Sequence, residues 1–239
     1  FLQETGAGQQ PFFDVRTCQP DAQFTSTWTP VKDAAVRIAN EQFTHWTRPN
    51  GSRYNETDPA MTQRLQEYWA AVGLTVTAAQ LQNSAWQEDH PWSAAFISWV
   101  MRQAGAGTAF TYASAHMRYV HAGKQNAEQR AVDNPFWTCA VTNALPEPGD
   151  LICRNRGNSR FTYDTIQSSG TSHCDLVTEV DYANNRMTVI GGNKSQTVNR
   201  EIIRLTASGL VDTSAHGEIF AILKFRTDKC ETCGTVAIV

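Results

Sequence analysis

The texture of the chain changes at Pro146, and this change restricts the possible folds more than any other feature. Before Pro146 apolar residues recur with helical spacing, whereas after it short β-rich runs alternate with turns. The expected helices cover about 31–46, 60–72, 91–104 and 112–121, with Gly73, Gly105 and Gly123 as helix-ending residues. The expected strands cover 150–154, 174–180, 187–190, 197–205 and 219–225. Helices followed by an antiparallel meander of about five strands predict an α+β fold and exclude a βαβ repeat.

The composition fits one domain with a full-sized core, because 41% of the 239 residues are hydrophobic and 18% are charged. We expect this domain over 31–228, after an extended N-terminal arm over 1–30 and before a C-terminal tail over 229–239. The net charge of -3, without a Lys/Arg stripe, argues against a nucleic-acid partner. No apolar run approaches the roughly 20 residues that cross a bilayer, so no membrane span is expected. The start at Phe1 is compatible with an exported, processed chain.

Six cysteines are more than a cytosolic protein of this size needs, and their even number permits up to three disulfides in an oxidising compartment. They are Cys18, Cys139, Cys153, Cys174, Cys230 and Cys233. The last two form a C-x-x-C, but a zinc site needs two further ligands at a suitable spacing. A local disulfide or free surface thiols therefore fits this pair better than a metal, and no metal or organic cofactor is expected.

The segment over residues 89–102 carries the first chemical signal. Pro91 suits the first position of a helix, which places Ser93 in the first turn among unpaired backbone N–H groups. Cysteine hydrolases hold their thiolate at such a position because the helix dipole lowers the thiol pKa. A serine hydroxyl gains less there, and it needs a general base and an oxyanion hole. Taken alone, Ser93 also fits an ordinary helix-start residue.

Two further segments carry polar residues at strand ends. His173 starts an expected strand, and Asp175 shares its face because side chains alternate along a strand. Cys174 points to the opposite face, which argues against it as a nucleophile beside His173. The other segment runs into Gly191-Gly192-Asn193. Each of these residues has an ordinary structural interpretation when taken alone.

In this order, the three segments resemble the papain-like peptidoglycan hydrolases, namely the CHAP amidases and the NlpC-type endopeptidases. Trp-Ser-Ala-Ala-Phe-Ile-Ser-Trp over residues 92–99 resembles their W-C-A-A-F-V-S-W nucleophile helix, with Ser93 at the position of the catalytic Cys. Pro-Gly-Asp-Leu-Ile over 148–152 and Ser-His-Cys-Asp-Leu-Val over 172–177 resemble the next strand and the catalytic-His strand. The serine version, with a downstream A-H-x-x-Y, looks closer still to a bacterial domain of unknown function (number 2272). The resemblance covers about residues 31–225.

The resemblance implies a papain-like fold, in which an N-terminal helical part with the nucleophile helix packs on the C-terminal sheet. Ser93 stands at the nucleophile and His173 at the base. Asn193 is the first choice for the residue that orients the imidazole, and Asp175 is the second. The residues expected to contact substrate are Trp92, His116 and Gly192. His116 fits a partly buried helix histidine equally well.

The implied function is hydrolysis of an amide in a peptidoglycan stem peptide, or of the amide that joins glycan to peptide, by a secreted or periplasmic bacterial protein. A stem peptide is the expected partner. An antibacterial effector would add an immunity protein, whereas a wall-remodelling lipoprotein domain would not. Two other functions stay open: an inactive module that binds wall fragments or a protein partner, and a lipid acyltransferase or esterase. The serine at position 93 has three possible explanations. The protein is a true serine hydrolase, or it has lost catalysis and kept a ligand-binding groove, or Ser93 is an engineered replacement of Cys.

Overall fold

The computed structural model describes residues 28–131 and 133–227. The expected tail and all of the expected arm except residues 28–30 lie outside this part, as do Cys18, Cys230 and Cys233. Residues 29 and 30 already belong to the first helix, so the expected arm is too long at its C-terminal end by those two residues.

The described residues form an α+β fold with six α-helices and one antiparallel sheet of six strands. The helices are α1 (Thr29–His45), α2 (Thr62–Ala70), α3 (Ala78–Leu81), α4 (Ser84–Asp89), α5 (Ser93–Ala104) and α6 (His116–Glu128). The strands are β1 (Phe136–Ala140), β2 (Leu151–Asn155), β3 (Ser172–Asp181), β4 (Arg186–Gly191), β5 (Asn199–Arg204) and β6 (Ile219–Phe225). Short 3-10 turns are η1 (Pro59–Met61), η2 (Gly107–Ala109) and η3 (Tyr182–Asn184).

The sheet order is β1-β6-β2-β3-β4-β5, so β2 to β5 form the expected meander and β6 returns between β1 and β2. The prediction of about five strands is wrong by one, because β1 was not recognised. Every residue of β1 is buried. A strand buried on both faces shows no alternation of polar and apolar residues, and periodicity then gives no signal.

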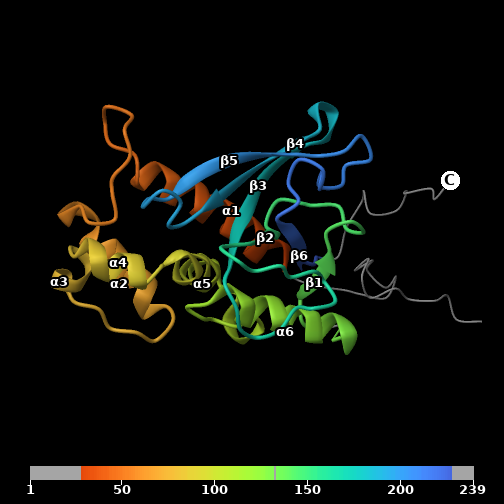
Figure 1. Ribbon diagram of the computed structural model, residues 1–239, viewed down its shortest axis with the longest axis horizontal. Helices are drawn as coiled ribbons and strands as arrows, with labels where there is room; N and C mark the ends of the chain where they lie inside the picture. The colour runs from red at the N-terminus through yellow and green to blue at the C-terminus, as the bar shows by residue number, and fades with distance from the viewer. Residues whose placement is uncertain (1–27, 132, 228–239) are drawn as a thin grey trace, which may run out of the picture.

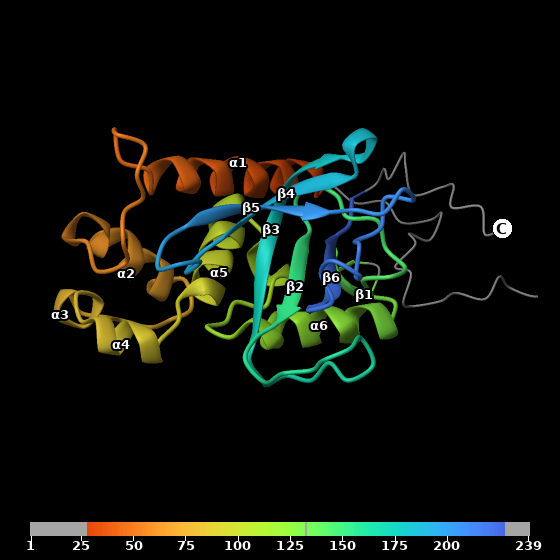
Figure 2. The ribbon, with the colours of Figure 1, turned by 45° about the horizontal axis from the view of Figure 1, so that its top comes forward.

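Two hydrophobic clusters occupy the two faces of the sheet. One face packs against α1, α5 and α6; in Figure 2, α5 lies between α1 above and α6 below, while α2, α3 and α4 gather at one end of the molecule. The opposite face gathers side chains from all six strands around Ile152, Val177 and Ile222. Adjacent strand residues such as Leu151 and Ile152 therefore point into different cores.

Helix α6 differs from the prediction at both ends. It begins at His116 and passes through Gly123, which was expected to end it, and continues to Glu128 (Figure 1). A Cβ on Gly123 would lie 2.3 Å from Leu223 Cδ1 and 2.6 Å from Thr138 Oγ1. The glycine therefore permits close packing of α6 against β1 and β6, and it does not stop the helix.

Helices α3 and α4 were not expected from the sequence. The side chains of Thr77 and Gln80 form a capping box at the start of α3, and Asn83 caps α4 by accepting from the backbone of Trp86. Thr-x-x-Gln is a helix-start pattern that the sequence contains. These two helices are too short to show helical periodicity, so capping was their available signal.

Candidate active site

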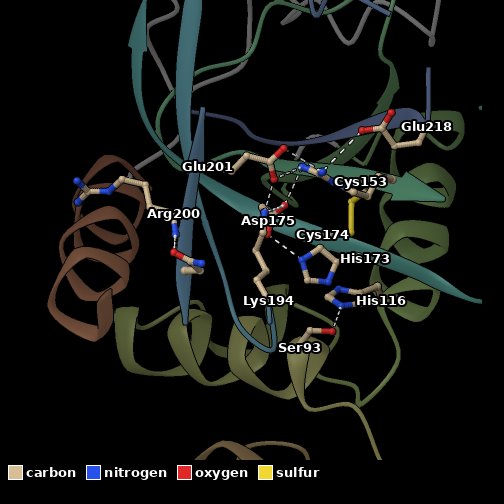
Figure 3. Close-up of polar contacts among 12 residues, drawn as sticks. Ser93, His116, Cys153, His173, Cys174, Asp175, Lys194, Arg200, Glu201 and Glu218 are labelled. Carbon is tan, nitrogen blue, oxygen red and sulfur yellow. Dashed lines mark hydrogen bonds and ion pairs between the residues drawn. A yellow bond between two sulfur atoms is a disulfide. The ribbon is translucent and has the colours of Figure 1, made fainter. Parts of the chain in front are cut away.

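Ser93 is the first residue of α5, and its side chain is buried at the junction of α5 and α6. Pro91 lies two residues before the helix and not at its first position, which shifts the expected start by two residues. The Ser93 hydroxyl lies 2.7 Å from Nε2 of His116, the first residue of α6 (Figure 3). The amides of the first turn of α5 have no partner within the helix, as the start of any helix requires.

His173 lies beside this pair on β3. Its Nε2 is 2.8 Å from Oδ1 of Asp175, two residues further along the same face of the strand. Its Nδ1 is buried and has no hydrogen-bond partner in the described part of the chain. The ring centroids of His116 and His173 are 5.2 Å apart, and Figure 3 shows His173 between Asp175 and His116.

The carboxylate of Asp175 is fully buried among positive charges. Its Oδ2 lies 3.0 Å from Arg154 and 3.1 Å from Lys194, and Glu201 pairs with both of these cations. Burial alone would raise the pKa of Asp175, but His173, Lys194 and Arg154 together lower it below its ordinary value. Asp175 is therefore ionised, and it accepts a hydrogen bond from Nε2–H of His173.

His116 and Tyr119, both on α6, are linked by a hydrogen bond, and their surroundings fix the protonation state of each. Burial lowers the pKa of His116 well below its ordinary value, and the nearby His173 lowers it further. Nδ1 of His116 is hydrogen-bonded to the hydroxyl of Tyr119, one helical turn later. Burial, followed by the charge of Asp175, raises the pKa of Tyr119 well above its ordinary value. At neutral pH His116 is therefore uncharged and Tyr119 keeps its proton.

The structure pairs His173 with Asp175, the second choice of the sequence analysis, and gives Asn193 a different partner. The Asn193 amide donates to the Glu56 carboxylate, which also accepts from Trp92 Nε1 at 2.8 Å. Asn193 lies in the turn after β4 with a φ of 56°, and its side chain contacts the segment before η1 through Glu56. Family position favoured Asn193, whereas the alternation of side chains along β3 favoured Asp175.

Gly191 and Gly192 allow the strand end to approach the site closely. A Cβ on Gly191 would lie 1.8 Å from Oδ1 of Asp175. A Cβ on Gly192 would lie 2.6 Å from Phe96 Cβ and 2.7 Å from Trp92 Cζ3. The absence of side chains therefore lets β4 cover Asp175 and the start of α5 at once.

A cavity of about 640 Å³ opens in front of Ser93. Its lining residues include Ser93, His116 and Asn193 together with Glu56, Gln87, Arg156 and Ser172. Trp92 and Gly192, which were expected to contact substrate, do not line this cavity. Trp92 is fully buried, and its ring stacks on those of Trp46 and Tyr68, with ring centroids 5.1 and 5.6 Å away. Its role is to anchor the start of α5.

A disulfide joins Cys153 on β2 to Cys174 on β3, and both side chains are buried. The two residues face each other in the antiparallel register, next to the register pair of Arg154 and His173. Cys174 therefore has no free thiol, which agrees with its exclusion as a nucleophile. None of the cysteines in the described residues is free.

Tyr119 and Glu56 were missed by the sequence analysis. Tyr119 had a signal, because A-H-x-x-Y places His116 and Tyr119 three residues apart on one helix face, where side chains contact each other. Glu56 had no such signal, since it lies in an irregular segment 37 positions before Ser93 in the sequence.

Among the described residues, no group of three or more His, Cys, Asp or Glu side chains is arranged to hold a metal ion. No helix in this part is long and apolar enough to cross a membrane.

These features define an α+β protein with a buried Ser–His contact and a His–Asp pair beside a polar cavity. The family described as "Uncharacterized protein conserved in bacteria (DUF2272)" matches residues 42–227, and the chain belongs to this family. The match confirms the resemblance to the bacterial domain of unknown function. No curated protein and no solved structure matches the chain significantly.

Proposed function

We propose that this protein is a papain-like serine hydrolase that cleaves an amide bond of peptidoglycan, either within the stem peptide or between glycan and peptide. The observation that carries the proposal is the 2.7 Å contact between the Ser93 hydroxyl and His116 Nε2, beside the His173–Asp175 pair and at the wall of the cavity. A helix start alone does little for a hydroxyl, and here two imidazoles accompany it.

The hydrogen bonds support different roles for the two histidines. Among the described residues, the buried hydroxyl of Tyr119 has His116 Nδ1 as its hydrogen-bond partner, so the hydroxyl donates and Nδ1 accepts. Nε2 of His116 then carries the proton and donates to Ser93 Oγ. The hydrogen of Ser93 needs another acceptor, and Nδ1 of the neighbouring His173 is bare. No hydrogen bond joins Ser93 to His173 in the structure, so the Ser93 hydroxyl has to turn toward His173 for the transfer. We therefore assign the base to His173 and a positioning hydrogen bond to His116.

The reaction then follows with the proton accounted for at each step. Ser93 Oγ attacks the amide carbon while His173 Nδ1 takes the hydroxyl proton, and Asp175 stabilises the imidazolium that forms. The first-turn N–H groups of α5 donate to the oxyanion. His173 returns the proton to the leaving nitrogen, which leaves an acyl ester on Ser93. Water, deprotonated by the same nitrogen, hydrolyses the ester and restores the hydroxyl.

We further propose that the protein acts in the periplasm or outside the cell. The buried disulfide between Cys153 and Cys174 supports this, because structural disulfides persist in oxidising compartments and are rare in the cytosol.

The test of the function uses the wild-type chain and Ser93→Ala. We expect a fluorophosphonate probe to add once to the wild type at Ser93 and not to the variant, as read by intact-mass spectrometry. Incubation of the wild type with purified sacculi is expected to release new muropeptides that the variant does not release. Unchanged muropeptides together with an unlabelled Ser93 would overturn the proposal. Equal binding of wall fragments by both proteins, without turnover, would indicate a binding module.

Tyr119→Phe tests the assigned roles of the two histidines. The substitution removes the donor that fixes the tautomer of His116, so we expect kcat to fall by about 10- to 100-fold with little change in KM. Tyr112→Phe is the matched control, because the Tyr112 hydroxyl makes no hydrogen bond with a described residue and its ring has an edge-to-face contact with Phe110 that the substitution keeps. Equal rates for the two variants in a muropeptide-release assay would contradict the assignment.

A further inference from the structure

Glu56 places a buried carboxylate in the wall of the cavity next to the candidate nucleophile. Its Oε2 accepts from Trp92 Nε1, on the residue directly before Ser93, and from the amide of Asn193. Its Oε1 makes no hydrogen bond with a described residue. Two donors from different segments thus hold the carboxylate in place, and one oxygen is left for a ligand in the cavity.

Gln87 adds a second acceptor to the same wall. Its side-chain nitrogen donates to the backbone oxygens of Leu81, at 2.9 Å, and of Glu56, at 3.3 Å. Because the nitrogen faces two carbonyl oxygens, the assignment of the amide is settled by its partners. Oε1 of Gln87 is buried without a hydrogen-bond partner, although the residue lines the cavity and is 2% exposed. A buried carbonyl oxygen without a donor is unusual, and a ligand supplies one.

The chemistry of these atoms selects the group that they bind. Oε1 of Glu56 and Oε1 of Gln87 are both acceptors, and the Glu56 carboxylate carries a negative charge. Neither of these two oxygens accepts a hydrogen bond from a described residue. A primary ammonium group offers three donors and a positive charge, whereas a hydroxyl or amide would leave the carboxylate uncompensated. Burial raises the pKa of Glu56, which shows that its charge is poorly solvated before a cation binds.

The charged side chains that line the cavity are unevenly distributed. Arg156, which follows β2, lines the same cavity and lies close enough to His116 to lower its pKa. The charge of Arg156 is thus near His116, whereas the carboxylate of Glu56 is held by Trp92 and Asn193, and a second carboxylate, Glu88, also lines the cavity. A cation entering the cavity is drawn toward Glu56 and away from Arg156.

We infer that Glu56 and Gln87 bind a primary ammonium group of the substrate, so that the protein selects peptides with a free amino group close to the cleaved bond. For cleavage, this inference rests on the proposed function. For binding it does not, because the cavity exists whether or not Ser93 reacts.

The experiment measures binding to the Ser93→Ala chain, in which no turnover interferes. The probes are a synthetic peptidoglycan stem tetrapeptide and the same peptide with every primary amine acetylated, titrated by isothermal calorimetry. We expect the free-amine peptide to bind about 10- to 100-fold more tightly, the range for loss of a charge-assisted hydrogen bond. Added potassium chloride is expected to weaken the free-amine peptide and to leave the acetylated peptide unchanged.

Glu56→Gln, added to the same chain, is expected to abolish the difference between the two peptides, because glutamine still accepts from Trp92 but carries no charge. Glu179→Gln is the matched control, since Glu179 is exposed on β3 and does not line the cavity. Equal affinities for the two peptides, no binding of either at millimolar concentration, or a preference that survives in Glu56→Gln would each overturn the inference. The salt dependence tests it even where that variant fails to fold. Amine-dependent binding without turnover by the wild type would overturn the proposed function alone.

Discussion

Replacing Asp175 with asparagine is expected to lower kcat by about 10³- to 10⁴-fold, with KM nearly unchanged. The Asp175 carboxylate accepts from Nε2–H of His173 and thereby keeps Nδ1 bare, ready to take the proton of Ser93. An asparagine amide can donate to Nε2 instead, which moves the imidazole proton to Nδ1 and blocks it as a base. The measurement is the rate of muropeptide release at saturating substrate.

Asp181→Asn is the matched control for this prediction. Asp181 ends the same strand, where it pairs with Arg186 and caps the turn at Asn184, and it takes no part in the site. Its substitution is expected to leave kcat unchanged. A rate for Asp175→Asn within about tenfold of the wild type would exclude Asp175 as the residue that orients the base.

Asp175→Asn is also expected to lower the stability of the protein, because Arg154 and Lys194 lose the negative charge that lies between them. We expect the free energy of unfolding at neutral pH to fall by about 3 kcal/mol. The pKa of Asp175 is lowered in the folded protein, so its contribution is fully present above the unfolded pKa of about 4 and is lost as the pH falls below it. Urea titrations between neutral pH and pH 3 are therefore expected to show a smaller acid-induced loss for Asp175→Asn than for the wild type.

Removing the disulfide between Cys153 and Cys174 is expected to lower the free energy of unfolding by about 3 kcal/mol, because the bond closes a loop of 21 residues. The double variant Cys153→Ala, Cys174→Ala tests this in a denaturant titration. A reductant is a poorer test, since Cys139 is also disulfide-bonded and would be reduced at the same time. Arg154 and His173 are the next register pair, so we also expect a reduced kcat. An unchanged unfolding midpoint would contradict the first expectation.

The parts of the fold that the sequence predicts are those with a clear period. The meander β2–β5 and the helices α1, α2 and α5 follow such patterns, with ends within a few residues of those observed. The strand β1 has buried residues on both faces, and Gly123 looks like a helix stop until Leu223 and Thr138 are placed against it. These features depend on neighbours that are distant in sequence, which a local pattern does not contain.

The candidate site also combines features that a local sequence pattern predicts with contacts between residues that are distant in sequence. The placement of Asp175 beside His173 follows from the two-residue period of a strand, and the start of α5 near Ser93 follows from Pro91 and the apolar run. The contact between Ser93 and His116 joins two helix starts that are 23 residues apart, and Glu56 joins Trp92 from 36 residues away. Neither distance corresponds to a turn of helix or a strand pair, so only the three-dimensional packing reveals these contacts.

The place of β6 in the sheet has a consequence for how the chain is synthesised. The strands β2 to β5 are sequential neighbours and can pair as each hairpin leaves the ribosome, but β1 pairs, among the six described strands, with β6 alone. From the emergence of Phe136 until that of Ile219–Phe225, the apolar strand β1 has no partner in the sheet, and β2 has one open edge. Nascent chains of intermediate length therefore expose an unpaired hydrophobic strand, the kind of segment that chaperones bind and that aggregates when they do not.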